Sequence, residues 1–130
     1  MNPYATRQGA LLYVYIPSMR LVSELNAREH WSSRSRRAKS QRESTTMILM
    51  TSVFRNTTRV RFPLQVTIVR VAPRKLDTDN LAASAKHVRD GIADWLGIND
   101  ATESVTWQVD QRRGLSGEYS VEIWIKETET

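Results

Sequence analysis

The chain has no cysteine among its 130 residues, which excludes disulfide bonds, thiolate nucleophiles, zinc–thiolate centres and iron–sulfur clusters. Long hydrophobic runs are also missing, since the run from Ala10 to Ile16 is far shorter than the ~18 residues that a membrane-spanning helix needs. The first residues show neither the basic start nor the small-residue cleavage site of a signal peptide. We therefore expect a soluble, cytoplasmic protein with no membrane partner.

The rest of the composition is that of an ordinary folded protein. Hydrophobic residues make up 40% and charged residues 25%, which argues against a disordered chain. A length of 130 residues leaves no room for a second hydrophobic core. We expect residues 1–130 to form a single domain.

Charge is distributed unevenly along the chain. Residues 20–75 carry 13 Lys and Arg against three acids, whereas residues 76–130 carry five Lys and Arg against 11 acids. The basic residues are 15 Arg and four Lys, and the planar guanidinium of Arg suits bidentate contacts with phosphate. This pattern favours a nucleic-acid partner for the first half, although a solvated charged surface would give the same count.

Apolar periodicity predicts six elements in the order β-α-β-α-β-β. They span about residues 10–16, 26–50, 60–71, 80–96, 105–109 and 119–125. The first helix would begin with a capping box at Asn26 and Glu29, and the first strand would be covered on both faces. Pro63 indicates an edge position or a late start for the second strand, and residues 113–118 would close a hairpin between the last two. The prediction is an α+β domain with one mixed sheet covered by two helices.

Acidic residues flank the predicted second helix. Asp77 and Asp79 are two positions apart at its start, a spacing that lets both carboxylates converge on one cation. Asp100 follows the helix, but a straight helix over 80–96 is about 25 Å long and would keep it away from Asp79. The acids could meet across a dimer, through a bent or shorter helix, or through a loop that folds back. Alternatively, Asp77 or Asp79 is an N-cap and Asp100 a turn residue.

Lys86 lies seven positions after Asp79, about two turns of a continuous helix, so the two side chains would project in nearly the same direction. Both lie opposite the apolar stripe of that helix. Carboxylates and an ammonium beside a metal would suit phosphodiester hydrolysis, because the ammonium steadies developing negative charge. An ordinary solvated charge on the helix is the alternative interpretation of Lys86.

The stretch RKLDTDNLAASAKHVRDGIADWLGIND, residues 74–100, resembles the signature region of the RusA family of phage-type Holliday-junction resolvases. That region has an acidic-x-acidic-Asn helix start, a Lys within the helix and a further acid after it. Residues 25–42, LNAREHWSSRSRRAKSQR, resemble the basic helix of the same family. The spacing from Asp79 to Lys86 is longer than in the prototype, and Asn99 stands where many members have an acid.

The resemblance implies a homodimer that binds branched DNA and cuts it symmetrically with Mg²⁺, with no small-molecule substrate. Asp77, Asp79 and Asp100 would be the metal-binding acids, and Lys86 the catalytic basic residue. The phosphate-binding residues would be Arg28, Arg34, Arg36, Arg37, Lys39 and Arg42.

Two other functions fit the same charges. One is a non-catalytic DNA-binding protein that keeps the fold and the basic helix, and the other is an interaction module whose basic helix meets an acidic protein. Trp31, beside the basic cluster, is a candidate for stacking on a base, whereas His30 and His87 lack the spacing of a zinc site.

Overall fold

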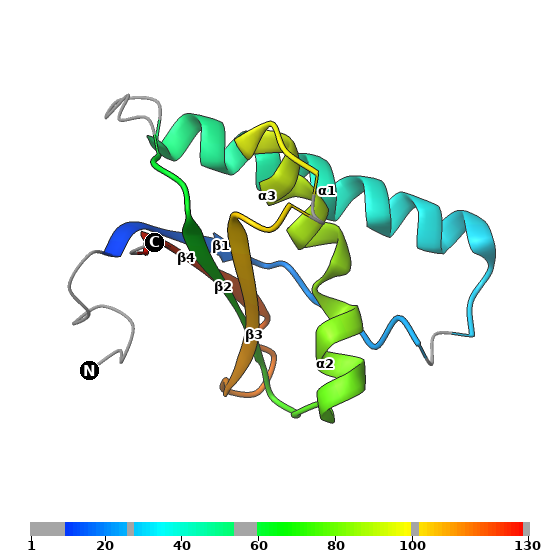
Figure 1. The fold of residues 1–130 in the computed structure, drawn as a ribbon. Helices are drawn as coiled ribbons and strands as arrows, with labels where there is room; N and C mark the ends of the chain where they lie inside the picture. Colours follow the sequence, from blue (N-terminus) through cyan, green and yellow to red (C-terminus); the bar gives the residue numbers. More distant parts are fainter. Residues whose placement is uncertain (1–9, 26–27, 54–59, 100–101, 129–130) are drawn as a thin grey trace.

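The computed structural model of the chain describes residues 10–25, 28–53, 60–99 and 102–128. Four strands and three helices follow one another in the order β-α-β-α-α-β-β (Figure 1). They are β1 (Ala10–Pro17), α1 (Trp31–Val53), β2 (Leu64–Ala72), α2 (Thr78–Ser84), α3 (Lys86–Leu96), β3 (Val105–Arg113) and β4 (Ser120–Glu127). The predicted α+β class and the single sheet are confirmed, with three helices where two were predicted.

The strands form one mixed sheet in the order β1-β4-β2-β3. β2 pairs in parallel with β3, while β4 is antiparallel to both β1 and β2. The predicted hairpin between the last two strands is therefore wrong, because β2 lies between them. β2 is buried along almost its whole length, and such a strand takes the centre of a sheet. The loop after β3 crosses the end of β2, where the Gly114 N–H donates to the Ala72 carbonyl at 2.8 Å.

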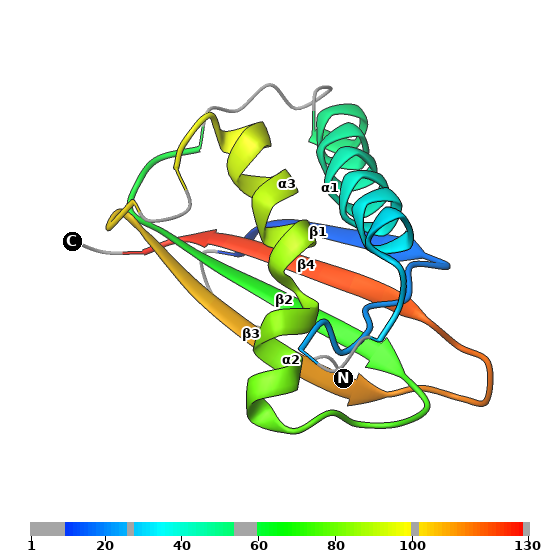
Figure 2. The ribbon, with the colours of Figure 1, turned by 90° about the vertical axis from the view of Figure 1, so that its right-hand side faces the viewer.

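All three helices cover the same face of the sheet (Figure 2). Beneath them, Ile68 of β2 and Ile123 of β4 form a buried core with Val88 and Ile92 of α3. No helix of the described ranges lies on the other face, and the exposure of Tyr13 and Tyr15 there shows that β1 is not covered on both faces as predicted. Its Tyr13 remains 43% exposed and is directed to that helix-free face.

The helices α1 and α3 approach each other closely at Gly91. A Cβ at this position would lie 2.5 Å from the backbone oxygen of Arg42, so any larger residue would push the two helices apart. The Thr46 hydroxyl donates to the Gly91 carbonyl at 2.9 Å and joins the helices at the same place. This contact fixes α1 relative to the helices that follow β2.

Several element boundaries differ from the predicted ones. α1 begins at Trp31, where His30 Nδ1 accepts from the Ser32 N–H, so the predicted start at Asn26 is wrong and Asn26 itself lies outside the described residues. The predicted helix over residues 80–96 is two helices that meet at Ala85. β2 begins at Leu64, which confirms a late start after Pro63 and not an edge position.

None of the helices in the described ranges combines the length and the hydropathy needed to cross a membrane.

Candidate functional site

The candidate site lies where the parallel strands β2 and β3 end side by side and the chain turns into α2. In open sheets with parallel strands, ligands bind beyond the carboxyl ends of those strands. Asp77 and Asp79 occupy this turn and the first turn of α2. The sheet therefore places both acids at an edge where ligands commonly bind.

A side chain from β3 holds the backbone directly before the acids. Gln111 accepts from the Leu76 N–H at 2.9 Å and donates to the Leu76 carbonyl at 2.8 Å. The Gln111 side-chain amide thus makes the two hydrogen bonds that a neighbouring strand would make with Leu76, and it fixes the residue that precedes Asp77. Sequence reasoning missed Gln111, although it continues the alternation of Val105, Trp107 and Val109 as a polar residue on the helix-facing side.

Asp77 is the N-cap of α2. Its Oδ1 accepts from the backbone N–H and from the side-chain amide of Asn80, both at 2.9 Å. These hydrogen bonds lower the pKa of the Asp77 carboxyl below its ordinary value, so the exposed side chain is ionised at neutral pH. The N-cap alternative is confirmed for Asp77, and the same hydrogen bonds orient its carboxylate.

Three hydrogen bonds join the connection between β1 and α1, the strand β2 and this turn. The Ser23 hydroxyl donates to Asn80 Oδ1, which links the connection to α2. Arg70 is 7% exposed and donates to the carbonyls of Leu21 and Arg74 at 2.9 and 2.7 Å. Burial lowers the pKa of Arg70. The turn before α2 is thus held from β2, from β3 and from the segment that leads into α1.

Lys86 belongs to a different helix from the two acids. Asp79 lies in the first turn of α2, whereas Lys86 is the first residue of α3, about 10 Å further along by the helical rise. Its side chain is 64% exposed and its ammonium lies 3.4 Å from the carboxylate of Asp90. Asp77 and Asp79 therefore lie at the same helix start, Lys86 begins the next helix, and Asp100 lies outside the described residues.

The two aspartates have the donor chemistry that Mg²⁺ requires. Mg²⁺ is commonly bound by one or two carboxylates, with waters and substrate phosphates as its remaining ligands. Asp77 and Asp79 are exposed at one helix start, and Asp77 is held as an anion by Asn80. Within the described ranges no group of three or more His, Cys, Asp or Glu residues is arranged to hold a metal. The fit to Mg²⁺ therefore depends on these two carboxylates.

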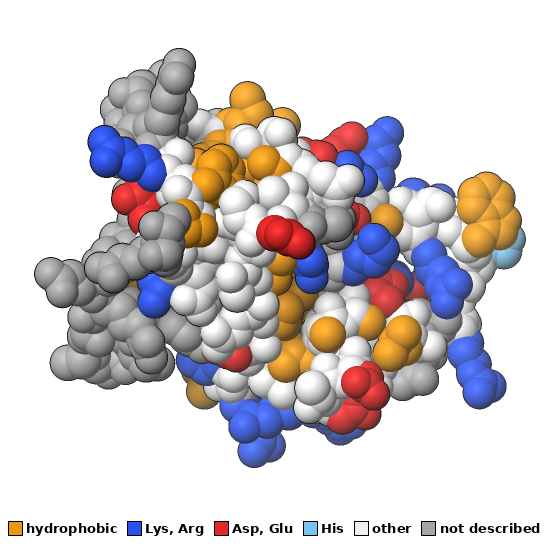
Figure 3. All heavy atoms as spheres, in the orientation of Figure 1, with side chains coloured by type: hydrophobic (Ala, Val, Ile, Leu, Met, Phe, Trp, Pro, Cys, Tyr) orange, Lys and Arg blue, Asp and Glu red, His pale blue; other side chains and the backbone are white. Residues whose placement is uncertain are grey.

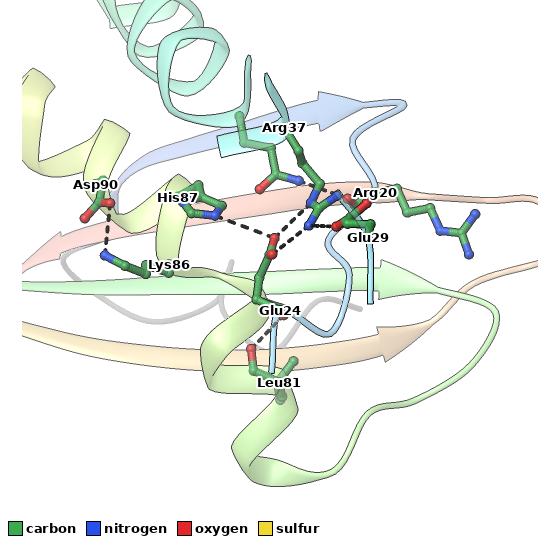
Figure 4. A network of polar contacts seen from close by, with 10 residues as sticks. Arg20, Glu24, Glu29, Arg37, Leu81, Lys86, His87 and Asp90 are labelled. Carbon is green, nitrogen blue, oxygen red and sulfur yellow. Dashed lines mark hydrogen bonds and ion pairs between the residues drawn. The ribbon is translucent and has the colours of Figure 1, made fainter. Parts of the chain in front are cut away.

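One residue of the predicted phosphate-binding set, Arg37, is engaged inside the fold (Figure 4). Its guanidinium donates to both carboxylate oxygens of Glu24, at 2.7 and 2.9 Å, and forms an ion pair with Glu29. These carboxylates raise the pKa of Arg37, which is 18% exposed. Glu24 also lies 3.6 Å from His87 Nε2. Arg37 and Glu24 together therefore join α1, the connection before it and α3, and the charge of Arg37 is compensated.

A second residue of that set, Arg42, is paired across the two helices. It donates to both oxygens of Asp94 on α3, at 2.6 and 2.8 Å. The other members, Arg28, Arg34, Arg36 and Lys39, are exposed. Figure 3 shows blue side chains on the outer surface of the N-terminal half of α1. These exposed members of the predicted set thus lie just before α1 and in its N-terminal half.

A groove of about 880 Å³ runs between α1 and α3. Its cations are Lys39, Arg42 and Lys86, and its anions are Glu43, Asp90 and Asp94. Because these charges balance, the groove as a whole has no net positive charge to attract a phosphate. The start of α2 and the outer side of α1 remain the candidate surfaces for an anionic polymer.

A scan of the sequence against models of known protein families finds no match, and a search of curated proteins also finds none.

Proposed function

We propose that this chain is a Mg²⁺-dependent, structure-selective endonuclease of the RusA resolvase type. As a homodimer in the cytoplasm, it hydrolyses phosphodiester bonds symmetrically in four-way or other branched DNA junctions. The observation that carries the proposal is the ordered Asp77-x-Asp79-Asn80 turn beyond the ends of β2 and β3. It is supported by the basic residues exposed on and just before α1.

Each part of the site has a distinct role in this reaction. A bound Mg²⁺ supplies positive charge that polarises the scissile phosphate and favours ionisation of a water. Asp77 and Asp79 hold that cation, and Asn80 keeps the Asp77 carboxylate ionised and oriented. Lys86 stabilises negative charge on the phosphate, and its exposed side chain is long enough to adjust to bound DNA. Asp100 completes the acidic set.

DNA binding depends on the basic surface of α1. Arg28, Arg34, Arg36 and Lys39 contact phosphates, while the exposed ring of Trp31 can stack on an unpaired base. The paired residues Arg37 and Arg42 contribute less, because carboxylates already compensate their charge. In a plot of the logarithm of the binding constant against the logarithm of the salt concentration, the slope is negative. Loss of one phosphate contact makes this slope less steep by about 0.9.

A non-catalytic DNA-binding protein is the second candidate. The distance between Lys86 and the aspartates favours it, as does the capping role of Asp77. Such a protein would keep its affinity for junctions when the aspartates are replaced by Asn, because the loss of negative charge reduces repulsion of DNA.

The decisive experiment is cleavage of a synthetic four-way DNA junction in Mg²⁺. It compares the wild-type chain, the Asp79→Asn variant and the wild-type chain with EDTA. Asp110→Asn, a change on the helix-free face of the sheet, is the matched control. We expect paired symmetric nicks from the wild type and the control, and none from Asp79→Asn or with EDTA.

The opposite result is equally clear. If wild type and Asp79→Asn bind junctions equally tightly and neither cuts, in Mg²⁺ or in Mn²⁺ and across several junction sequences, the enzyme proposal is wrong. DNA binding by α1 would then be the function. If neither protein prefers junctions to linear duplex, both proposals fail.

A further inference from the structure

The two outer strands of the sheet differ in charge. β3 ends one side of the sheet, and its sequence VTWQVDQRR includes Asp110, Arg112 and Arg113. Among the strands that the structure describes, β1 ends the other side, and its sequence ALLYVYIP contains no charge. In fact, no charged residue occurs from Gln8 to Met19. Outer strands expose backbone donors and acceptors to other strands, and proteins usually protect them with charges. β1 lacks this protection.

The sequence of β1 is complementary to itself. Two copies that run antiparallel about a two-fold axis at Val14 place Tyr13 opposite Tyr15 of the partner subunit. In the same register, Leu12 lies opposite Ile16 of the partner subunit. Val14 and Ile16 are buried on the helix-covered face, whereas Tyr13 and Tyr15 are 43% and 45% exposed on the other. Aliphatic side chains thus meet aliphatic ones and aromatic rings meet aromatic rings.

The helical layer is hollowed beside this edge. α1 is the outer helix on the β1 side of the layer (Figure 2). A hollow of about 340 Å³ lies between the end of β1 and the flank of α1, where the small side chains of Ser40 and Ser44 line it. Small residues let helices approach closely, so the α1 helices of two subunits can lie side by side.

We propose that β1 is the dimer interface, through which two copies of this chain join their sheets antiparallel about Val14. The four-stranded sheets then form one continuous sheet, with both layers of helices on the same face. The exposed basic starts of the two α1 helices become related by the two-fold axis, as symmetric cleavage of a junction requires. This inference rests on the homodimer of the proposed function and identifies β1 as the surface through which the two subunits bind each other.

The absence of native cysteine makes the register directly testable by cross-linking. Tyr13→Cys and Tyr15→Cys are prepared as single-cysteine chains, mixed and mildly oxidised. We expect the mixture to form a disulfide-linked dimer efficiently, and either variant alone to do so far less, because residues 13 and 15 face each other across the axis. Thr106→Cys mixed with Gln108→Cys on β3 is the matched control and is expected to stay unlinked. Thermal melting verifies that each variant is folded.

The mass of the unmodified chain gives an independent measurement. We expect sedimentation equilibrium to show a dimer of the 15.0 kDa chain. Tyr15→Lys places a charge in the interface and should raise the dimer dissociation constant about tenfold or more, whereas Thr106→Lys on β3 should leave it unchanged.

Three results would overturn the interface. They are a chain that remains monomeric, a dimer that Tyr15→Lys leaves unaffected, and cross-linking that is equally efficient for Tyr13→Cys alone, which would indicate another register. None of these measurements reads cleavage. A protein that dimerises through β1 but does not cut junctions would support the interface and contradict the proposed activity. A protein that cuts junctions but dimerises through another surface would support the activity and contradict the interface.

Discussion

Two helices begin within ten residues of each other, α2 at Thr78 and α3 at Lys86, and their starts are held very differently. At α2 the Asp77 side chain caps the helix, Gln111 holds the residue before it, and Ser23 contacts Asn80. At α3 the N-cap is Ala85, whose methyl side chain cannot accept a hydrogen bond. Lys86 contacts Asp90 from an exposed position.

This difference separates the acidic and basic parts of the proposed site. The Asp77 carboxylate is oriented by hydrogen bonds that exist before any ligand arrives, and such preorganisation strengthens electrostatic binding. The ammonium of Lys86 ends a flexible chain in water, so it takes its working position only when DNA is present. The following predictions test this division.

The largest effect is expected from Asp77→Asn. Asn caps a helix as well as Asp does, so the melting temperature should change little. The negative charge is lost, however, and we expect single-turnover cleavage of a junction to fall about 10³-fold. Asp77→Ala should lose the cap as well and lower the melting temperature. Full cleavage by Asp77→Asn would show that Asp77 is a cap and nothing more.

The second effect concerns the clamp on Leu76. Gln111→Ala leaves the Leu76 N–H and carbonyl without their partner, which should lower the free energy of unfolding by about 1–2 kcal/mol. If the clamp positions the acids, the Mg²⁺ concentration for half-maximal cleavage should also rise about 10- to 100-fold. Urea unfolding and a Mg²⁺ titration measure the two effects.

Gln108→Ala is the matched control on the same strand. Its side chain contacts Gln65 and Asp110 on the other face of the sheet, so the Mg²⁺ requirement should not change. A Gln111→Ala variant that loses stability but keeps the wild-type Mg²⁺ requirement would make the clamp a purely structural contact.

The sequence predicts much of the fold because alternation and helical period are local properties. The strands, the apolar stripe of Val88 and Ile92, and the end of α3 at Gly97 follow from it. The break at Ala85 does not, since Ser84, Ala85 and Lys86 carry no helix-breaking signal. The two helices have different long-range partners, because α2 contacts β3 whereas α3 contacts α1. Apolar residues also alternate in the same way whether two strands form a hairpin or have a third strand between them. The alternation in β3 and β4 therefore could not predict that β2 lies between them.

The site was predictable to a similar degree. The carboxylate pair at the helix start depends on adjacent residues, and the structure keeps Asp77 and Asp79 on one turn. The predicted direction of Lys86 depended on a continuous helix, and the structure has two helices that meet at Ala85. The pairing of Arg37 with Glu24 is set by how the segment before α1 folds back, which no local pattern encodes.

A smaller effect is expected from Lys86→Met. We expect cleavage to fall about tenfold, less than for a fixed donor, because a solvated flexible ammonium contributes less to the transition state. The free energy of unfolding should stay within about 0.5 kcal/mol of the wild type, as for most exposed substitutions. Lys86→Arg should restore most of the rate. Cleavage by Lys86→Met at the wild-type rate would leave Lys86 an ordinary surface charge.

The smallest effect concerns His87, the second residue of α3. Burial lowers the pKa of His87 from its ordinary value of 6.5, although Glu24 and Asp90 act in the opposite direction and Lys86 and Arg37 reinforce the shift. The folded protein therefore favours neutral His87, and the unfolded chain binds the proton more readily. It follows that the stability His87 contributes is complete above pH 6.5 and is lost as the pH falls through its folded pKa.

Urea unfolding from about pH 8 to about pH 5 tests this, because the carboxyl groups titrate mostly below that range. Wild type should lose stability toward the acid end, and His87→Gln should lose less over the same interval. If the two curves stay parallel, the start of α3 does not respond to protonation. The contact between His87 and Glu24 would then be as independent of pH as the hydrogen bonds at the start of α2. The two helix starts would differ only in the exposed, flexible Lys86.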